Sequence, residues 1–185
     1  MTRVCIVLAV ALVSVLFGMA DMAVVSQKLQ AIKNDGNWHV AFRNLSREQE
    51  AVLAARPEVE QTAWYDAVNY RLDQGYRIGG TETVICGMEE AFLEIMSCQI
   101  EEGRFPEEEN EAILTKGART RLGLKAGDTV ALALPDGKSA ELTVSGFVGD
   151  TAMLMDKDAF GIFVNRGAFG RLAPGKPEES PDGRI

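Results

Sequence analysis

The chain has 185 residues, a formal net charge of −8 and 46% hydrophobic residues. This length is enough for one domain with a substantial core. The acidic balance argues against binding to nucleic acid or to anionic lipid through a basic face, because such binding needs clustered positive charge. The three cysteines are too few for a disulfide scaffold.

An uncharged apolar run over residues 4–20 begins the chain. Asp21 interrupts it, and the apolar character then continues to Val25. Because about 17 to 25 apolar residues cross a bilayer, the sequence predicts a transmembrane helix over residues 4–25. Arg3 precedes the run and, by the positive-inside rule, predicts a cytoplasmic N-terminus. The rest of the chain is then extracytoplasmic.

The same run has the features of a secretory signal peptide. Arg3 forms a minimal positive region, and Gly-Met-Ala at 18–20 forms a small-x-small cleavage site. The run is longer than the usual apolar region of a signal peptide, and the sequence continues as a helix beyond it. Both fates stay open: an anchored protein, or an exported soluble binding module released after Ala20.

The helical continuation predicts a stalk over residues 26–36. Val25, Leu29 and Ile32 repeat at helical spacing, and Gly36 supplies a stop signal. We therefore expect one helix from about residue 3 to residue 35 that projects beyond the membrane. The stripe of Val25, Leu29 and Ile32 is the candidate contact with another helix.

Residues 37–172 predict a mixed α/β domain with mainly antiparallel strands, so the overall fold class is α+β. A strand is expected at 38–43 from its alternating pattern. A helix is expected at 46–55, because Ser46 and Gln49 form a capping box, with Val52 and Leu53 facing inward. The later strands are expected at 59–70, 76–78, 83–86, 111–115, 129–134, 140–148 and 161–164. The later helices are expected at 88–96, 116–122 and 165–172.

Pro135-Asp136-Gly137 predicts a hairpin turn between two of these strands. In that hairpin Val130, Leu132 and Leu134 are expected to face Leu142 and Val144. Gly146 permits a bulge or a close approach. Residues 173–185 are rich in proline, glycine and glutamate and predict a disordered tail.

Residue patterns typical of enzymes do not occur in the sequence. His39 is the single histidine, and no Gly-x-x-x-x-Gly-Lys-Ser/Thr loop is present. The acidic residues at 101–111 are interpreted as a solvated loop, since no calcium-loop pattern accompanies them. Cys86 and Cys98 could pair or remain free thiols. The sequence predicts no catalytic residue, no metal site and no cofactor.

Several ordered motifs resemble FtsX-like ABC-transporter permeases. Three early motifs resemble the first membrane helix and early periplasmic part of these permeases. They are Phe-Gly-Met-Ala-Asp (17–21), Trp-His-Val-Ala-Phe-Arg-Asn-Leu-Ser (38–46) and Arg-Pro-Glu-Val (56–59). The later block, Glu-Gly-Arg-Phe-Pro (102–106) to Val-Ser-Gly-Phe (144–147), resembles their MacB-like periplasmic core domain. The motif residues are Gly103, Arg104, Pro106, Glu111, Gly123, Gly127 and Asp128.

The resemblance implies a permease subunit in the cell (inner) membrane, with a separate ABC ATPase, further permease helices and a dimeric assembly as partners. Its outer domain would couple ATP-driven helix movement to export of peptides, drugs or lipoproteins. No second apolar run follows residue 25. We therefore expect a single-pass chain that is a fragment or a truncated relative, with an incomplete core domain over 37–172.

A third hypothesis is a small β-barrel module. The pattern Leu-Gly-Leu-x-x-Gly-Asp-x-Val at 122–130 also resembles barrel domains of large oxidoreductases. This reading leaves the apolar N-terminal run unexplained, and a closed barrel that contains the 128–148 hairpin would support it.

Overall fold

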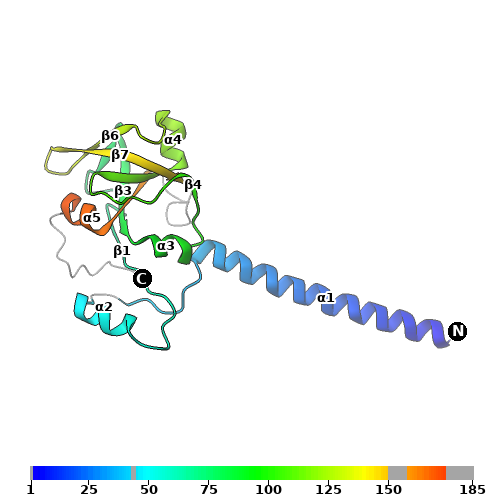
Figure 1. Cartoon of the computed structure of the whole chain (residues 1–185). Helices are drawn as coiled ribbons and strands as arrows, with labels where there is room; N and C mark the ends of the chain where they lie inside the picture. Colours follow the sequence, from blue (N-terminus) through cyan, green and yellow to red (C-terminus); the bar gives the residue numbers. More distant parts are fainter. Residues whose placement is uncertain (1, 43–44, 150–157, 174–185) are drawn as a thin grey trace.

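The computed structural model describes residues 2–42, 45–149 and 158–173, and it consists of one long helix attached to an α+β domain (Figure 1). The helices are α1 (Thr2–Asp35), α2 (Arg47–Ala54), α3 (Glu90–Ile95), α4 (Lys116–Leu122) and α5 (Arg166–Leu172). The strands are β1 (Tyr65–Val68), β2 (Arg77–Ile78), β3 (Thr81–Met88), β4 (Ile100–Gly103), β5 (Glu111–Thr115), β6 (Thr129–Ala133), β7 (Ser139–Val148) and β8 (Phe160–Val164). Apart from Ala173, the predicted tail lies outside the described residues.

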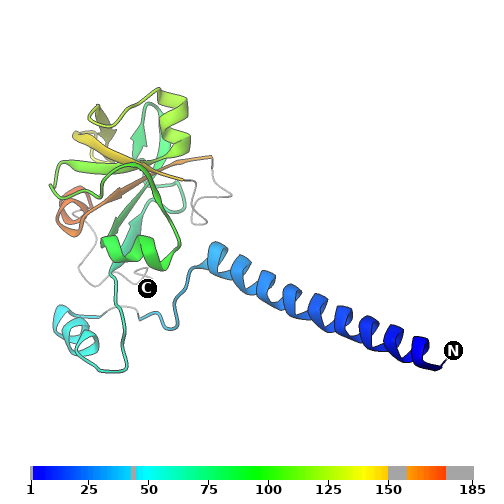
Figure 2. The same cartoon turned by 45° about the vertical axis from the view of Figure 1, so that its right-hand side comes forward.

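Helix α1 is continuous, which confirms the predicted helix from about residue 3 to residue 35. It projects away from the domain in both views (Figure 1, Figure 2). Among the described residues, it is the one helix long and apolar enough to cross a membrane, over Ile6–Ile32. Its large hydrophobic side chains, such as Val4, Leu16 and Leu29, are exposed. Such a surface is compatible with lipid or with other apolar helices.

Six strands close into a ring. β3 pairs with β2, β2 with β6, and β6 with β7. β7 then pairs with β5, β5 with β8, and β8 with β3. The pairs β3–β8 and β5–β7 are parallel and the others are antiparallel. We call these strands the six-stranded ring; β1 joins it at β3, and β4 joins it at β7.

The ring has a core on each side of its strands. On β5, Leu114 belongs to the inner core, while Ile113 belongs to a second core that includes Phe92 of α3. Strand β8 is buried at all five positions. Strands buried on both faces have continuous apolar sequences, as Phe-Gly-Ile-Phe-Val of β8 illustrates.

Several predicted elements match the structure closely. β5 and α4 have the predicted bounds, and the hairpin of β6 and β7 pairs Val130 with Leu142. Asn165 caps α5, where its side chain accepts a hydrogen bond from the Ala168 amide. The barrel architecture named as a third hypothesis is present, because the hairpin belongs to a closed ring of six strands.

Other predictions on the same domain are wrong. No regular element covers residues 37–42, where a strand was expected, and the strand predicted at 59–70 is reduced to β1. In both cases the described structure offers no neighbouring strand to the missing part. Val52 of α2 is 61% exposed instead of facing inward, and β4 was not predicted. β4 is acidic, so its sequence has no apolar alternation to mark it as a strand.

Candidate coupling site at the helix–domain junction

The junction of α1 with the domain is compact. Helix α1 is followed by Gly36 at φ +90°, whose amide donates to the Ile32 carbonyl at 2.9 Å. The Asn37 amide then donates to the Ile95 carbonyl at the end of α3, at 2.7 Å. A Cβ atom at Gly36 would lie 2.8 Å from the Met96 sulfur and 3.0 Å from the Ile95 carbonyl oxygen. Glycine is therefore needed here for both its backbone conformation and its small size.

Helix α3 connects this junction to the sheet. Phe92 of α3 is buried, and its ring stacks on that of Tyr65 in β1, with ring centres 4.5 Å apart and planes 7° apart. The chain leaves α3 towards β4, which pairs with β7 of the ring. Helix α3 therefore contacts both the residue that follows Gly36 and β1, and it is followed in the chain by β4. The sequence identified Gly36 as a helix stop but gave no signal for its partner on α3.

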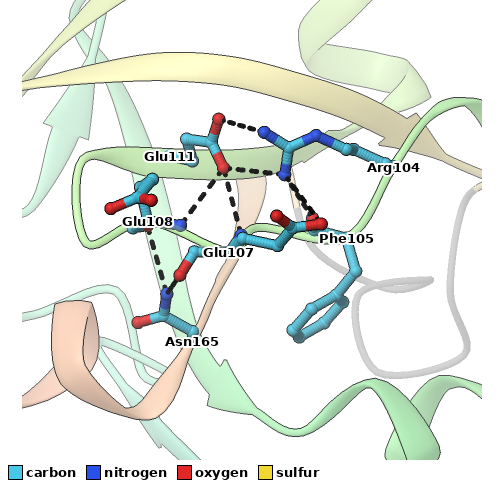
Figure 3. A network of polar contacts seen from close by, with 6 residues as sticks. All are labelled: Arg104, Phe105, Glu107, Glu108, Glu111 and Asn165. Carbon is cyan, nitrogen blue, oxygen red and sulfur yellow. Dashed lines mark hydrogen bonds and ion pairs between the residues drawn. The ribbon is translucent and has the colours of Figure 1, made fainter.

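The first group of motif residues forms a clamp around the loop 104–110 (Figure 3). The Arg104 guanidinium donates to both Glu111 carboxylate oxygens, at 2.6 and 2.9 Å. The same carboxylate accepts the amides of Glu107 and Glu108, at 3.0 and 3.2 Å. Asn165 of α5 donates to the carbonyls of Glu107 and Glu108. The loop is thus held from its own two ends and from α5, with Pro106 buried inside it.

Charge and burial at this clamp shift two pKa values. Desolvation raises the pKa of the Glu111 carboxyl, but hydrogen bonds from Arg104 and from the two loop amides outweigh it and lower the pKa below 4.5. The hydrogen bond to Glu111 raises the pKa of Arg104 in turn. The Glu111 side chain is 14% exposed and that of Arg104 is 50% exposed. The pair therefore remains charged at neutral pH, in a partly solvated site.

The second group of motif residues shapes the turn before β6. Gly123 ends α4 in the left-handed conformation, at φ +67°. The Gly127 amide donates to the Val144 carbonyl at 2.8 Å, and the Asp128 carboxylate accepts the Lys125 amide. These contacts order the turn and leave no group in it arranged for bond chemistry.

Both groups of motif residues meet at one segment of β7, residues 143–146. Gly103 pairs with Gly146, and the Arg104 amide donates to the Ser145 carbonyl. A Cβ atom on Gly146 would lie 2.5 Å from the Glu102 carbonyl oxygen. The Val144 amide donates to the Asp128 carbonyl from the other side. The predicted close approach at Gly146 is therefore present, and this segment of β7 is held by both flanking turns.

The candidate stripe on α1 lies apart from both groups. Val25 and Leu29 are exposed, and Ile32 is half-buried near the junction. The stripe therefore remains available to a partner helix, and its role stays a prediction.

Neither metal nor disulfide chemistry is indicated by the described residues. They contain no group of three metal-ligating side chains. Cys86 and Cys98 are not joined by a disulfide. Burial, and secondarily the charge of Glu101, raises the pKa of the Cys98 thiol to about 11, so it is not a reactive thiolate.

Comparison with known families assigns the chain to one of them. The model of the MacB-like periplasmic core domain matches residues 1–180. The chain belongs to this family. Its resemblance to FtsX-like ABC-transporter permeases is thereby confirmed, and its domain is the extracytoplasmic domain of a MacB-like permease. No curated protein sequence matches the chain.

A solved structure of the family agrees with this chain at the level of the fold. The periplasmic region of MacB from Actinobacillus actinomycetemcomitans is 12% identical, with a TM-score of 0.53. The match covers 77% of this chain and 64% of that one. The extracellular domain of the noncanonic ABC-type transporter YknZ from Gram-positive bacteria is 11% identical, with a TM-score of 0.47, over 76% and 69% of the two chains. This chain thus spans about 64% of the MacB periplasmic region that it matches.

Proposed function

We propose that the chain is part of a permease subunit whose outer domain transmits movement of α1 to a substrate or partner outside the membrane. A separate ABC ATPase drives the movement, and the exported substrate belongs to the peptide, drug or lipoprotein class. No bond chemistry is performed by the chain itself. The proposal extends the family membership with one observation from the structure, the direct bond from Asn37 to the Ile95 carbonyl of α3.

This bond supports coupling because it leaves little slack between the membrane helix and the domain. Helix α1 is a continuous rod, since all its internal hydrogen bonds are local. Its end meets α3 within one residue of Gly36, and α3 is anchored in the second core through Phe92 and Leu93. Tilting or rotation of α1 therefore displaces α3, because no flexible linker separates the end of α1 from its contact with α3.

The membrane arrangement that goes with this proposal follows the sequence. Residues 4–25 span the inner membrane in contact with lipid, residues 26–36 form the stalk, and the N-terminus is cytoplasmic. Further permease helices contact Val25, Leu29 and Ile32, and two permeases form a dimer in the complete transporter. Residues 37–172 form the outer core domain.

Membrane fractionation and intact mass spectrometry separate this arrangement from the alternative of an exported binding module. We expect the chain to resist extraction by alkaline carbonate and to keep its residues before Asp21. A mature protein that begins at Asp21 and is released at high pH would overturn the anchored arrangement and favour the exported module.

Coupling itself can be measured in the complete transporter reconstituted in nanodiscs. Spin labels on unnatural amino acids at Gln27 of α1 and Glu141 of β7 report the distance between the helix and the ring. We expect this distance to change on trapping the ATPase with nucleotide. Insertion of Gly-Ser-Gly between Asp35 and Gly36 should abolish the change while ATP hydrolysis continues.

The matched control places the same insertion in the exposed turn between Asp136 and Gly137, where it should leave the distance change intact. Loss of the distance change in both variants, or in neither, would contradict a route through the junction.

A further inference from the structure

Helix α2 is attached to the domain in a different way from the other helices. None of its residues is buried, whereas α3, α4 and α5 each bury at least one side chain. It lies apart from the strands in both views (Figure 1, Figure 2). We call residues 45–62, which contain α2 and its return to the domain, the strap. Apolar packing therefore contributes little to holding α2 in place.

An ion pair between Arg166 and Glu50 joins α2 to the body of the domain. Arg166, the first residue of α5, donates two hydrogen bonds of 3.1 Å to the two carboxylate oxygens of Glu50. The two side chains are 30% and 27% exposed, respectively. The Arg166 guanidinium also lies over the Trp64 ring, 4.7 Å from its centre. A bidentate pair stacked on an aromatic ring is stronger than an ordinary surface pair, because its geometry is fixed and partly desolvated.

Arg166 has a second carboxylate within reach. A Glu89 oxygen lies 3.9 Å from the guanidinium, and the other Glu89 oxygen accepts the Trp64 amide at 3.0 Å. Glu89 is the N-cap residue of α3, the helix whose other end receives the Asn37 amide. Arg166 is therefore placed between a carboxylate of the strap and a carboxylate of the helix at the α1 junction.

An open groove of about 1660 Å³ is lined by the strap, by residues 37–42 and by the body of the domain. Its lining includes Leu53 and Val59 of the strap, and Trp64, Phe92 and Met96 of the domain. Movement of the strap would widen this groove and expose part of its apolar lining to solvent. The width of the groove thus depends on what holds α2.

We propose that Arg166 and Glu50 form a latch that holds the strap against the domain. When the latch opens, α2 moves away and the Arg166 guanidinium pairs with Glu89. Because Glu89 and the α1 junction lie at opposite ends of α3, displacement of α3 shifts the balance between the two carboxylates. This last step rests on the proposed function, whereas the latch itself is a property of the chain alone.

Hydrogen exchange of the full chain in detergent micelles tests the latch. In Glu50→Gln and Arg166→Gln, we expect amides of α2 to exchange roughly fivefold to tenfold faster, in line with the loss of a partly exposed ion pair and a cation–π contact. Amides of β5 and β8 should exchange at the wild-type rate. The double variant should exchange no faster than the faster of the two single variants, because each change removes the same pair.

Salt gives an independent readout. Raising the salt concentration to 1 M shortens the Debye length to about 3 Å, and should therefore speed exchange in wild-type α2 but not in Arg166→Gln. In a Trp38→Phe background, Trp64 is the sole remaining tryptophan. Its quenching by acrylamide should rise when Arg166 is replaced, since the guanidinium no longer covers the ring.

Two controls separate the latch from general effects of charge. Glu48→Gln removes the other acidic residue from the first turn of α2, and Arg77→Gln removes an arginine paired within the β2–β3 hairpin. Both should leave the ratio of α2 to ring exchange unchanged. The latch is overturned if Glu48→Gln accelerates α2 as much as Glu50→Gln does, or if neither Glu50→Gln nor Arg166→Gln accelerates it.

The latch and the coupling proposal can fail separately. If α2 opens on loss of the pair but nucleotide trapping does not alter the α1-to-ring distance, the latch stands and the proposed function fails. If the distance changes but hydrogen exchange in α2 is the same in wild type, Glu50→Gln and Arg166→Gln, the proposed function stands and the latch fails.

Discussion

The six-stranded ring and residues 37–42, which lead to the strap, both have apolar patterns typical of strands, but they differ in burial. All five residues of β8 are buried between two neighbouring strands. Trp38, Val40 and Phe42 alternate with polar or small residues, as a strand would, and they are 50%, 59% and 45% exposed. The difference within the described residues is the presence of a neighbouring strand, because a strand is stabilised by cross-strand pairs. An apolar pattern typical of a strand therefore indicates that a segment can pair with another strand. In the ring, each strand has such neighbours within the described residues.

The largest expected difference between the two regions is in the cost of truncating an apolar side chain. Leu114→Ala removes a fully buried side chain of the inner core and should lower the free energy of unfolding by about 3 to 4 kcal/mol. Val52→Ala on the exposed face of α2 should change it by less than about 0.5 kcal/mol. Urea unfolding of the full chain in micelles measures both. Equal costs would mean that α2 packs more tightly than its exposure indicates.

Close backbone contact in the ring should produce the next largest effect. Gly103 has φ +86°, and a Cβ atom there would collide with the Ser145 carbonyl and the Gly146 backbone. Gly103→Ala should cost about 3 kcal/mol, the sum of backbone strain and overpacking. Gly80 has φ +82° but open space around it, so Gly80→Ala should cost only the strain, about 1 kcal/mol. Similar unfolding midpoints for the two variants would exclude the close contact.

The elements of the ring were predictable where local sequence sets their bounds. Asn110 and Gly123 flank the continuous run of β5 and α4, and Pro135-Asp136-Gly137 sets the hairpin turn. Closure of the ring was harder to predict from the sequence. It depends on the parallel pairs β3–β8 and β5–β7, which join strands far apart in the chain. Periodicity describes one strand at a time and carries no information on such pairs.

The junction and the latch were beyond prediction for the same reason. Gly36 is recognisable as a helix stop, but the hydrogen bond that follows it, from the Asn37 amide to the Ile95 carbonyl, joins residues far apart in the chain. Arg166 and Glu50 are separated by 116 positions, and no motif in the sequence around either residue marks them as a pair. In contrast, Arg104 and Glu111 are seven residues apart, and the motif resemblance drew attention to both. Local contacts leave a signature in sequence, whereas contacts between distant surface charges do not.

Removal of the Glu111 carboxylate from the clamp beside the ring should have a moderate and pH-dependent effect on the free energy of unfolding. Glu111→Gln should destabilise the chain at pH 7 by about 1 kcal/mol, which is the value of charged hydrogen bonds reduced for solvent screening of Arg104. The folded-state pKa of Glu111 is lowered, so its contribution is present above its ordinary value of 4.5. That contribution is lost as pH falls through the lowered folded-state pKa. Unfolding midpoints of wild type and variant should therefore converge on acidification, and a constant difference down to pH 3 would contradict the assignment.

The smallest effect should be confined to the strap. Ser46 accepts a hydrogen bond from the Gln49 amide, and the Gln49 side chain accepts one from the Ser46 amide, so the predicted capping box is present. Ser46→Ala should weaken α2 by about 1 kcal/mol, and Ser46→Asp should restore it, since Asp is an equally good N-cap. Hydrogen exchange should show faster opening of α2 alone, with the urea midpoint of the chain unchanged. Because α2 buries no residue, its helix can fray without loosening the ring. A fall in the global midpoint like that of Leu114→Ala would instead make the strap an integral part of the folded core.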